Sequence, residues 1–190
     1  MAVWPAKVRF AGVGRPVRLA DPWLDPGETF DGETALEDLP LVGDAEDAAR
    51  ILARYLVVRL IRSAVTPGPG YRADLELAAA RSYLGLIPPH DPDRRALTPF
   101  LQGSGPPAVD ERFVRQIDAA AAVGIRRSQF RSSFALLHAG YRVLRARSRH
   151  GEAALLARRI GSFCAQRSAP DAARLWRLRA GAHERRSAAS

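Results

Sequence analysis

The chain has 190 residues, an apolar content of 47% and a net charge of +9, which suits a globular protein of one domain or one domain with an appendage. The single cysteine, Cys164, excludes an internal disulfide. The chain also lacks an apolar run of the length that a signal peptide or a membrane span needs. These features predict a cytoplasmic protein without a membrane partner.

The charges are unevenly distributed along the chain. Residues 1–110 carry a net charge of −3, whereas residues 111–190 carry +12 and only 5 acidic groups. This asymmetry predicts an acidic partner for the C-terminal part, with nucleic acid first, an acidic protein second and solubility alone third. Lys7 is the only lysine. A GC-rich genome would explain the preference for arginine, but it would not explain the scarcity of acids.

Residues 1–43 are predicted to form a loop-rich N-terminal arm or cap. Apolar and polar residues alternate on both sides of Gly12-Val13-Gly14, which predicts a short β-hairpin. Asp21-Pro22, Asp25-Pro26 and Asp31-Gly32 then predict successive turns. Because the segment has little core of its own, we expect it to dock on a neighbour or to cover the core of this chain.

Residues 44–102 are predicted to form a helical N-terminal subdomain. Asp44 is a predicted N-cap, and the helix that follows it ends before Pro67. A second helix is predicted from 71 to 86. A short third helix follows Asp91-Pro92, which has the pattern of an N-cap with proline at the first helical position. The glycine- and proline-rich residues 103–107 are the predicted linker.

Four further helices are predicted after the linker, at 109–123, 127–147, 151–167 and 170–186. The breaks between them are placed at Gly124, at residues 149–151 and at residues 169–171. Short connections favour antiparallel neighbours, so residues 108–190 are predicted to form a basic helical bundle. The predicted fold class is mainly α: an antiparallel helical bundle of about six to seven helices.

The helix predicted at 127–147 has the clearest amphipathic pattern. Its apolar stripe consists of Phe130, Phe134, Leu137, Tyr141 and Leu144. A neighbouring sector of roughly 60°, at about 100° per residue, carries Arg131, His138, Arg142, Arg145 and Arg149. Guanidinium groups at this pitch match the oxygens of a phosphate backbone, although a solvated charged face has the same pattern. The candidate nucleic-acid-binding residues are Arg112, Arg115, Arg126, Arg127, Arg131, Arg142, Arg145, Arg149, Arg158, Arg159, Arg174 and Arg177.

A helix-turn-helix over residues 120–137 is an alternative interpretation. Gly124 would be the turn glycine, and Arg126, Arg127, Ser128 and Gln129 would open the recognition helix. An ordinary corner between two bundle helices has the same pattern.

The sequence predicts no catalytic, metal or cofactor site and no small-molecule substrate. His90, Asp91 and Asp93 could suggest a metal site, but helix capping explains Asp91-Pro92. The chain has no motif around a nucleophile, and neither Gly12-Val13-Gly14 nor Gly103-Ser104-Gly105 completes a phosphate-binding loop. Cys164 and Trp176 lie on predicted apolar faces, so we expect both in the core.

Several stretches resemble one known family. Asp110-Glu111-Arg112-Phe113-Val114-Arg115-Gln116-Ile117 is similar to the Glu-Arg-containing helix of the small subunit of the CRISPR Cascade effector. Residues 134–139, 154–159 and 173–177 resemble the order of helices and basic positions in that family's C-terminal bundle. Residues 75–86 and 96–101 resemble the part before it, so the resemblance covers about residues 71–186.

This resemblance implies a small, all-helical, non-catalytic subunit that lines a guide-RNA-bearing complex. Its partners would be guide RNA, single-stranded DNA or both, together with other protein subunits. The arginines that the resemblance assigns to the guide–target hybrid and the displaced strand are Arg112, Arg115, Arg142, Arg145, Arg158, Arg159 and Arg174.

The sequence therefore predicts a non-enzymatic helical subunit that binds nucleic-acid backbone through its arginine-rich C-terminal bundle. A helical protein–protein adaptor or scaffold subunit of a larger assembly is the first alternative. A helix-turn-helix DNA-binding regulator is the second.

Overall fold

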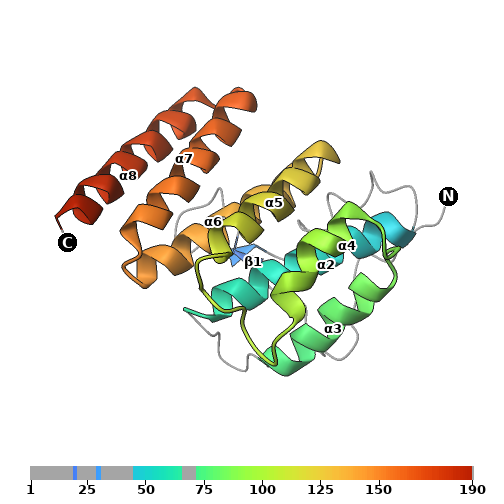
Figure 1. Cartoon of the computed structure of the whole chain (residues 1–190). Coiled ribbons are helices and arrows are strands. Elements are labelled where there is room, and N and C mark those ends of the chain that lie inside the picture. The colour runs from blue at the N-terminus through green and yellow to red at the C-terminus, as the bar shows by residue number, and fades with distance from the viewer. Residues whose placement is uncertain (1–18, 21–28, 31–44, 66–71, 190) are drawn as a thin grey trace.

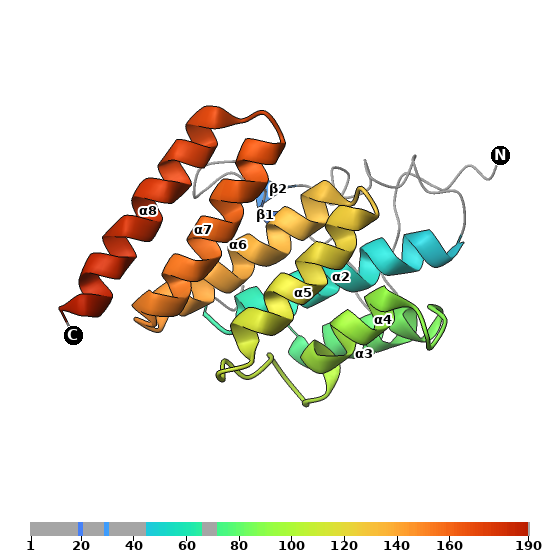
Figure 2. The ribbon, with the colours of Figure 1, turned by 45° about the horizontal axis from the view of Figure 1, so that its top comes forward.

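The computed structural model describes residues 19–20, 29–30, 45–65 and 72–189. These ranges contain seven α-helices, which pack as an antiparallel bundle (Figures 1 and 2). The helices are α2 (Ala45–Ser63), α3 (Ala73–Gly85), α4 (Pro92–Leu97), α5 (Phe113–Arg126), α6 (Phe130–Ala146), α7 (His150–Gln166) and α8 (Pro170–Ala188), with a 3-10 turn, η2 (Thr98–Leu101), after α4. The mainly α bundle predicted from the sequence is confirmed. Among the described helices, none combines the length and apolar character that crossing a bilayer requires.

Helix α6 occupies the centre of the bundle. It packs against α2, α5 and α7, and α8 lies along the outer side of α7 (Figure 1). Four members of its predicted apolar stripe, Phe134, Leu137, Tyr141 and Leu144, are buried, and Phe130 packs half-buried at the edge of the core. One cluster of buried apolar side chains extends from α2 to α8. Residues 103–107 therefore connect helices that share one core.

The two described strands form a single antiparallel pair. In this pair, β1 (Leu19–Ala20) places Leu19 opposite Phe30 of β2 (Thr29–Phe30). Both ribbon views show the pair close to α6 (Figures 1 and 2). The hairpin predicted around Gly12-Val13-Gly14 and the N-cap predicted at Asp44 lie outside the described residues.

Three equivalent corners connect α5, α6, α7 and α8. Each contains a serine in the left-handed region, and these serines recur twenty residues apart, at Ser128 (φ 62°), Ser148 (φ 55°) and Ser168 (φ 56°). At the first corner the Ser128 N–H donates to the Ile125 carbonyl (3.0 Å) and the Gln129 N–H to the Gly124 carbonyl (2.9 Å). The same pair of bonds recurs at the other two corners. These bonds define a Schellman cap, in which glycine usually occupies the left-handed position.

The helix break predicted at Gly124 is wrong. Helix α5 continues through Gly124 to Arg126, because Ser128 makes the turn. The glycine permits a close approach instead. A Cβ atom at this position would lie 2.3 Å from the Ser133 hydroxyl oxygen and 2.8 Å from the Arg54 guanidinium.

A buried charge network ties α2, α4 and the corner after α5 together. The predicted cap at Asp91 is confirmed, since its side chain accepts the Asp93 N–H (2.8 Å) and Pro92 is the first residue of α4. Asp91 Oδ2 also accepts from Arg50 Nη2 (3.0 Å) and Arg127 Nη2 (2.9 Å). Burial alone would raise the pKa of Asp91. Its hydrogen bonds and the arginine charges together lower the pKa by more than burial raises it, so the carboxyl pKa lies below its ordinary value.

Arg54 and Asp93 form the innermost pair of this network. Both side chains have 0% exposure, and the Arg54 guanidinium donates to Asp93 and to the Ala120 carbonyl of α5. Complete burial lowers the pKa of Arg54, and the charge of Asp93 opposes that shift. Arg127 Nε lies 2.8 Å from the second Asp93 carboxylate oxygen. Asp93 of α4 and the N-cap residue Asp91 thus hold arginines from two other parts of the chain.

Replacing Asp93 with asparagine tests this network. Asp93→Asn leaves Arg54 buried without its counter-charge, so we expect the free energy of unfolding to fall by about 3–5 kcal/mol. Urea denaturation measures the change. Asp74→Asn is the matched control, because it removes a carboxylate from the exposed pair with Arg72 and should leave the unfolding midpoint unchanged. Equal effects of the two variants would contradict the network's role.

The corner geometry predicts a stabilising substitution at Ser148. Ser148→Gly removes left-handed strain of about 1–2 kcal/mol, which exceeds the entropic cost of glycine, about 0.5–1 kcal/mol. We therefore expect a higher free energy of unfolding, measured in urea. Ser162→Gly, at an exposed position inside α7, is the control and should destabilise by about 0.5–1 kcal/mol. A loss of stability in Ser148→Gly would contradict the corner described above.

Candidate nucleic-acid interface

Arginines from three helices gather beside two histidines, of which His138 is half-buried and His183 is buried. One arginine lies at the end of α2, two lie on α6 and two lie on α8. Three of these charges act on His138 and the other two act on His183, and the Tyr141 ring lies between the two histidines, 6.4 Å from one and 5.6 Å from the other. We call this set the cationic face: Arg62, Arg142, Arg145, Arg179 and Arg186.

His138 lies under one end of the cationic face. Its ring stacks on Phe134 at a centroid distance of 6.1 Å and meets the edge of Trp176 at 5.8 Å. Burial, followed by the nearby charges, lowers the pKa of His138 to about 3, and these charges belong to Arg142, Arg62 and Arg179. The sequence placed His138 on a basic surface, but its imidazole is a neutral ring packed among aromatic side chains.

Arg62 is the most perturbed arginine of the face. Burial lowers its pKa to about 10, with further contributions from the charges of Arg142 and Arg59. Arginine seldom loses affinity for its proton, because the guanidinium delocalises its charge. Groups with perturbed pKa values are enriched at functional sites.

His183 lies under the other end of the face and connects three helices. Its Nε2 is 3.1 Å from the Tyr141 hydroxyl of α6, and its Nδ1 is 3.1 Å from His150 Nδ1 at the start of α7. Burial, followed by the charges of His150, Arg186 and Arg145, lowers the pKa of His183. The residues whose charges lower this pKa are therefore all cationic when protonated.

Four of the sequence-predicted arginines are engaged with acids and do not join the face. Arg127 belongs to the buried network, and Arg149 binds Glu152 and the Val109 carbonyl. The other two are Arg158, paired with Glu184, and Arg159, whose Nε lies 2.6 Å from Asp118. These side chains tie helices to one another or brace a helix end.

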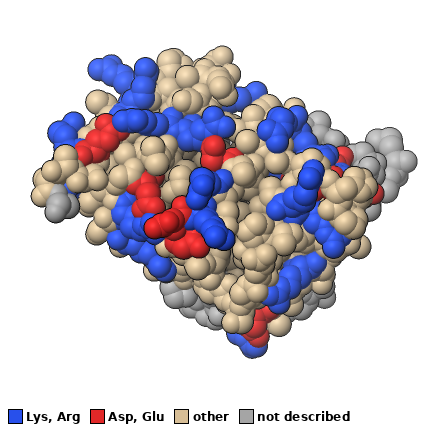
Figure 3. Space-filling model, in the orientation of Figure 1, with Lys and Arg blue, Asp and Glu red and all other residues tan. Residues whose placement is uncertain are grey.

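The remaining predicted arginines divide between the face and other surfaces. Arg142 and Arg145 are exposed members of the face, and Arg131 is half-buried in the first turn of α6. The others are exposed on α5 and α8 or just before α5, and the described residues include no acid paired with them: Arg112, Arg115, Arg126, Arg174 and Arg177. Figure 3 shows basic side chains dispersed over its face of the molecule, several beside acidic ones.

Sequence reasoning missed three members of the face. Arg62 lies on a helix far from the others in sequence, and Arg179 and Arg186 lie on the side of α8 next to α6, away from Arg174 and Arg177. The positions of residues around the axis of α8 could have identified Arg179 and Arg186. Trp176, Ala180 and His183 form its buried stripe, and Arg179 and Arg186 flank one side of that stripe.

The burial of α6 argues against the helix-turn-helix alternative. A recognition helix presents its N-terminal turns to the major groove. Residues 132–137 of α6 are all buried in the bundle instead. The metal site suggested by His90, Asp91 and Asp93 is also unsupported, because arginines hold both aspartates. Within the described ranges, no group of three or more potential ligands could hold a metal ion.

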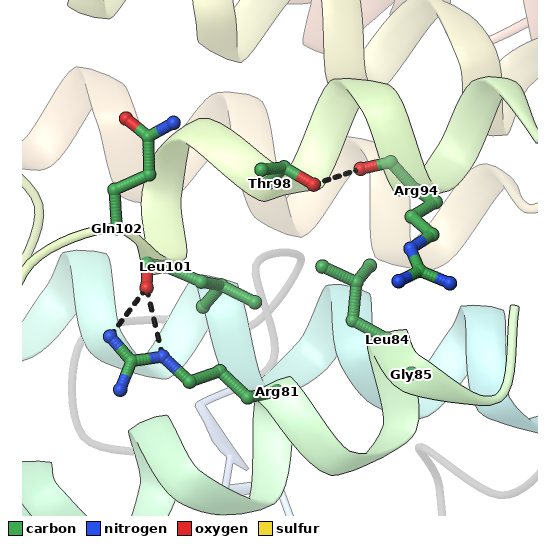
Figure 4. Close-up of a pocket in the computed structure, with 7 residues that line it drawn as sticks. All are labelled: Arg81, Leu84, Gly85, Arg94, Thr98, Leu101 and Gln102. Carbon is green, nitrogen blue, oxygen red and sulfur yellow. Dashed lines mark hydrogen bonds between the residues drawn. The ribbon is translucent and has the colours of Figure 1, made fainter. Parts of the chain in front are cut away.

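One pocket lies between α3, α4 and η2 (Figure 4). Its two cationic side chains are engaged by backbone oxygens: Arg81 Nη2 donates to the Leu101 carbonyl (2.7 Å), and Arg94 Nη1 donates to the Ile87 carbonyl (2.7 Å). The other lining residues are Leu84, Gly85, Thr98, Leu101 and Gln102. This lining contains neither a nucleophile paired with a base nor an acid–base pair.

Comparisons with protein-family models, curated proteins and solved structures find no match to this chain. The functional argument therefore rests on the described side chains.

The low pKa of His138 predicts a pH dependence of stability. Its folded pKa of about 3 lies below the ordinary value of 6.5. Neutral His138 therefore contributes fully to the stability of the fold above pH 6.5, and this contribution is lost as the pH falls toward 3, because the unfolded chain binds the proton more tightly. His138→Phe keeps an aromatic ring and should flatten the slope of unfolding free energy between pH 6 and 4 by up to about 1.4 kcal/mol per pH unit. Urea denaturation across pH measures it. The exposed-histidine control, His90→Gln, should retain the parental slope; a parental slope in His138→Phe would contradict the shift.

Proposed function

We propose that this protein is a non-enzymatic helical subunit that binds the phosphate backbone of nucleic acid through its cationic face. The observation that carries this proposal is the gathering of arginines from α2, α6 and α8 around half-buried His138, whose neutral ring packs against Phe134 and Trp176. Like charges at close range repel one another. A bound polyanion would offset that cost, so the arrangement is favourable when phosphate lies on the face.

The chemistry of the face suits backbone contacts rather than base reading. Guanidinium groups donate two parallel hydrogen bonds to phosphate oxygens. Arg179 and Arg186 are two helical turns apart, about 10.5 Å along α8, a span of about three nucleotides in one strand of a duplex. Phosphate contacts position a protein on nucleic acid but carry no sequence information. We therefore expect little sequence preference.

The family resemblance makes this proposal more specific. We propose guide RNA, single-stranded DNA or both as the ligand, and other protein subunits of an RNA-guided CRISPR effector as neighbours. The all-helical fold agrees with what that resemblance implies. Of the arginines that it assigns, Arg142 and Arg145 lie in the cationic face, whereas Arg158 and Arg159 pair with acids of this chain.

Exposed leucines favour the adaptor alternative. Leu155 on α7 is 52% exposed, and Leu175 and Leu178 on α8 are 48% and 63% exposed. Leucines beside arginines on an outer helix would suit an acidic, amphipathic segment of a protein partner. This alternative predicts no measurable nucleic-acid affinity at near-physiological salt.

Reversing two arginines of α6 tests the proposal. Arg142→Glu with Arg145→Glu should weaken binding to labelled single-stranded RNA and DNA in fluorescence anisotropy across a salt series. If each arginine contacts one phosphate of a single strand, the slope of log affinity against log salt becomes shallower by about 1.4. Helical content should stay unchanged, because both side chains are exposed.

The matched control is Arg112→Glu with Arg115→Glu. It makes the same change in net charge beside and on α5, outside the cationic face. The control should keep the parental salt slope. Equal losses in both double variants would mean that net charge alone drives binding, and no binding of the parent at about 0.1 M salt would remove the proposal.

A further inference from the structure

We propose that the outer side of α8 docks an acidic amphipathic helix of a partner protein, which adds one further helix to the stack formed by α5 to α8. This docking does not depend on the proposed binding of nucleic acid, because the leucines that carry it lie outside the cationic face. The position of α8 in the bundle, the apolar stripe on its outer side and the charges along that stripe each support the assignment.

Helix α8 is the last of four helices that stack through equivalent corners. Among the described helices, α6 and α7 each pack between two neighbours of this stack, whereas α8 packs extensively only against α7. Both ribbon views show α8 at the edge of the bundle, with α7 beside it (Figures 1 and 2). In proteins built from stacked helices, the terminal helix carries a polar outer surface, which keeps the chain soluble. An apolar outer surface on such a helix therefore points to a further packing partner.

The outer side of α8 carries an apolar stripe. At about 100° per residue, Leu178 lies roughly opposite the buried side of α8, and Leu175 and Ala182 lie within roughly 60° of Leu178. The described ranges expose five large apolar side chains, and two of them, Leu175 and Leu178, lie within one helical turn of each other here. The spacing of three and then four residues is that of a seam between two packed helices. This pattern suits the apolar stripe of a partner helix laid along α8.

The charges along this stripe favour an acidic partner. Arg174 and Arg185 follow one edge of the stripe, and both are exposed, with no acid of the described residues paired to them. Arg179 of the cationic face bounds the other edge. Of the two acids in α8, Glu184 pairs with an arginine of α7 and Asp171 lies in the first turn. Carboxylates beside the apolar stripe of a partner helix would therefore meet arginine along both edges.

The same features disfavour two other occupants of this side. A second copy of the chain, related by twofold symmetry, would place arginine against arginine along the seam. A phosphate backbone would meet the arginines, but it offers no apolar surface to cover the leucines. A helix with leucines on one side and carboxylates beside them matches both the stripe and its charges.

A designed peptide is the probe, because its stripe and its charges can be varied separately. The probe is a labelled helical peptide of about 20 residues, with leucines at the a and d positions of a heptad and glutamates beside them. Fluorescence anisotropy with the full chain should show micromolar binding. One control peptide has lysines in place of the glutamates, and a second has glutamines in place of the leucines. Each control should bind at least about tenfold more weakly. Equal binding of the acidic peptide and either control, or no binding of the acidic peptide, would overturn the inference.

A matched pair of variants locates the binding surface. Leu178→Gln should weaken binding of the acidic peptide about tenfold, because an apolar side chain no longer leaves water on docking. Leu86→Gln is the control, since it makes the same change after α3 at a leucine that is 61% exposed, against 63% for Leu178. It should retain the parental affinity. Glutamine is a good helix former, so circular dichroism of both variants should match the parent. Equal affinities of the two variants would show that α8 is not the docking surface.

The docking and the proposed function can fail separately. Leu178→Gln should bind labelled single-stranded RNA as the parent does, because this leucine lies outside the cationic face, and a loss of RNA binding would contradict the separation of the two surfaces. A parent protein that binds the acidic peptide but no RNA keeps the docking and removes the proposed function. A parent protein that binds RNA but not the acidic peptide keeps the proposed function and removes the docking.

Discussion

The buried pair of Arg54 and Asp93 is the interaction on which the rest of the bundle depends. Neither side chain is exposed, and each would be a costly buried charge without the other. The same guanidinium binds the Ala120 carbonyl, so one arginine of α2 fixes both α4 and α5. Since α6 packs between α2 and α5 and follows α5 through a three-residue corner, this network also sets where the exposed edge of α6 meets the end of α2.

The corners and small residues then determine where the arginines of α8 lie. Three equal caps turn the chain at equal intervals, so α5 to α8 stack in sequence. Gly161 of α7 faces α8, since a Cβ there would be in ordinary contact, 3.4 Å, with the Ala173 carbonyl oxygen. Trp176 reaches past α7 to meet Tyr141 edge-on at 4.9 Å. This contact fixes the rotation of α8 and directs Arg179 toward the α6 side.

Much of the fold follows from local patterns, but the partners of charged residues do not. Periodicity predicted the buried stripe of α6, and the Asp91-Pro92 pair predicted the start of α4, because both depend on neighbours within a few residues. The helix break predicted at Gly124 was wrong because a glycine can permit close packing as well as a turn. The close contact with Ser133, which shows that Gly124 serves packing, is visible only in the structure. Arg127 and Arg159 looked available in sequence because their acids, Asp91 and Asp118, lie 36 and 41 residues away.

The acids of the described helices have a mainly structural use. Most acids of the described helices pair with an arginine, either in another helix, as in Arg59–Glu76 and Arg158–Glu184, or a few residues away, as in Arg149–Glu152. These pairs join or brace helices. Eight of the chain's 20 acids lie instead in residues 21–44. The carboxylates of the described helices therefore serve mainly as ties within the bundle.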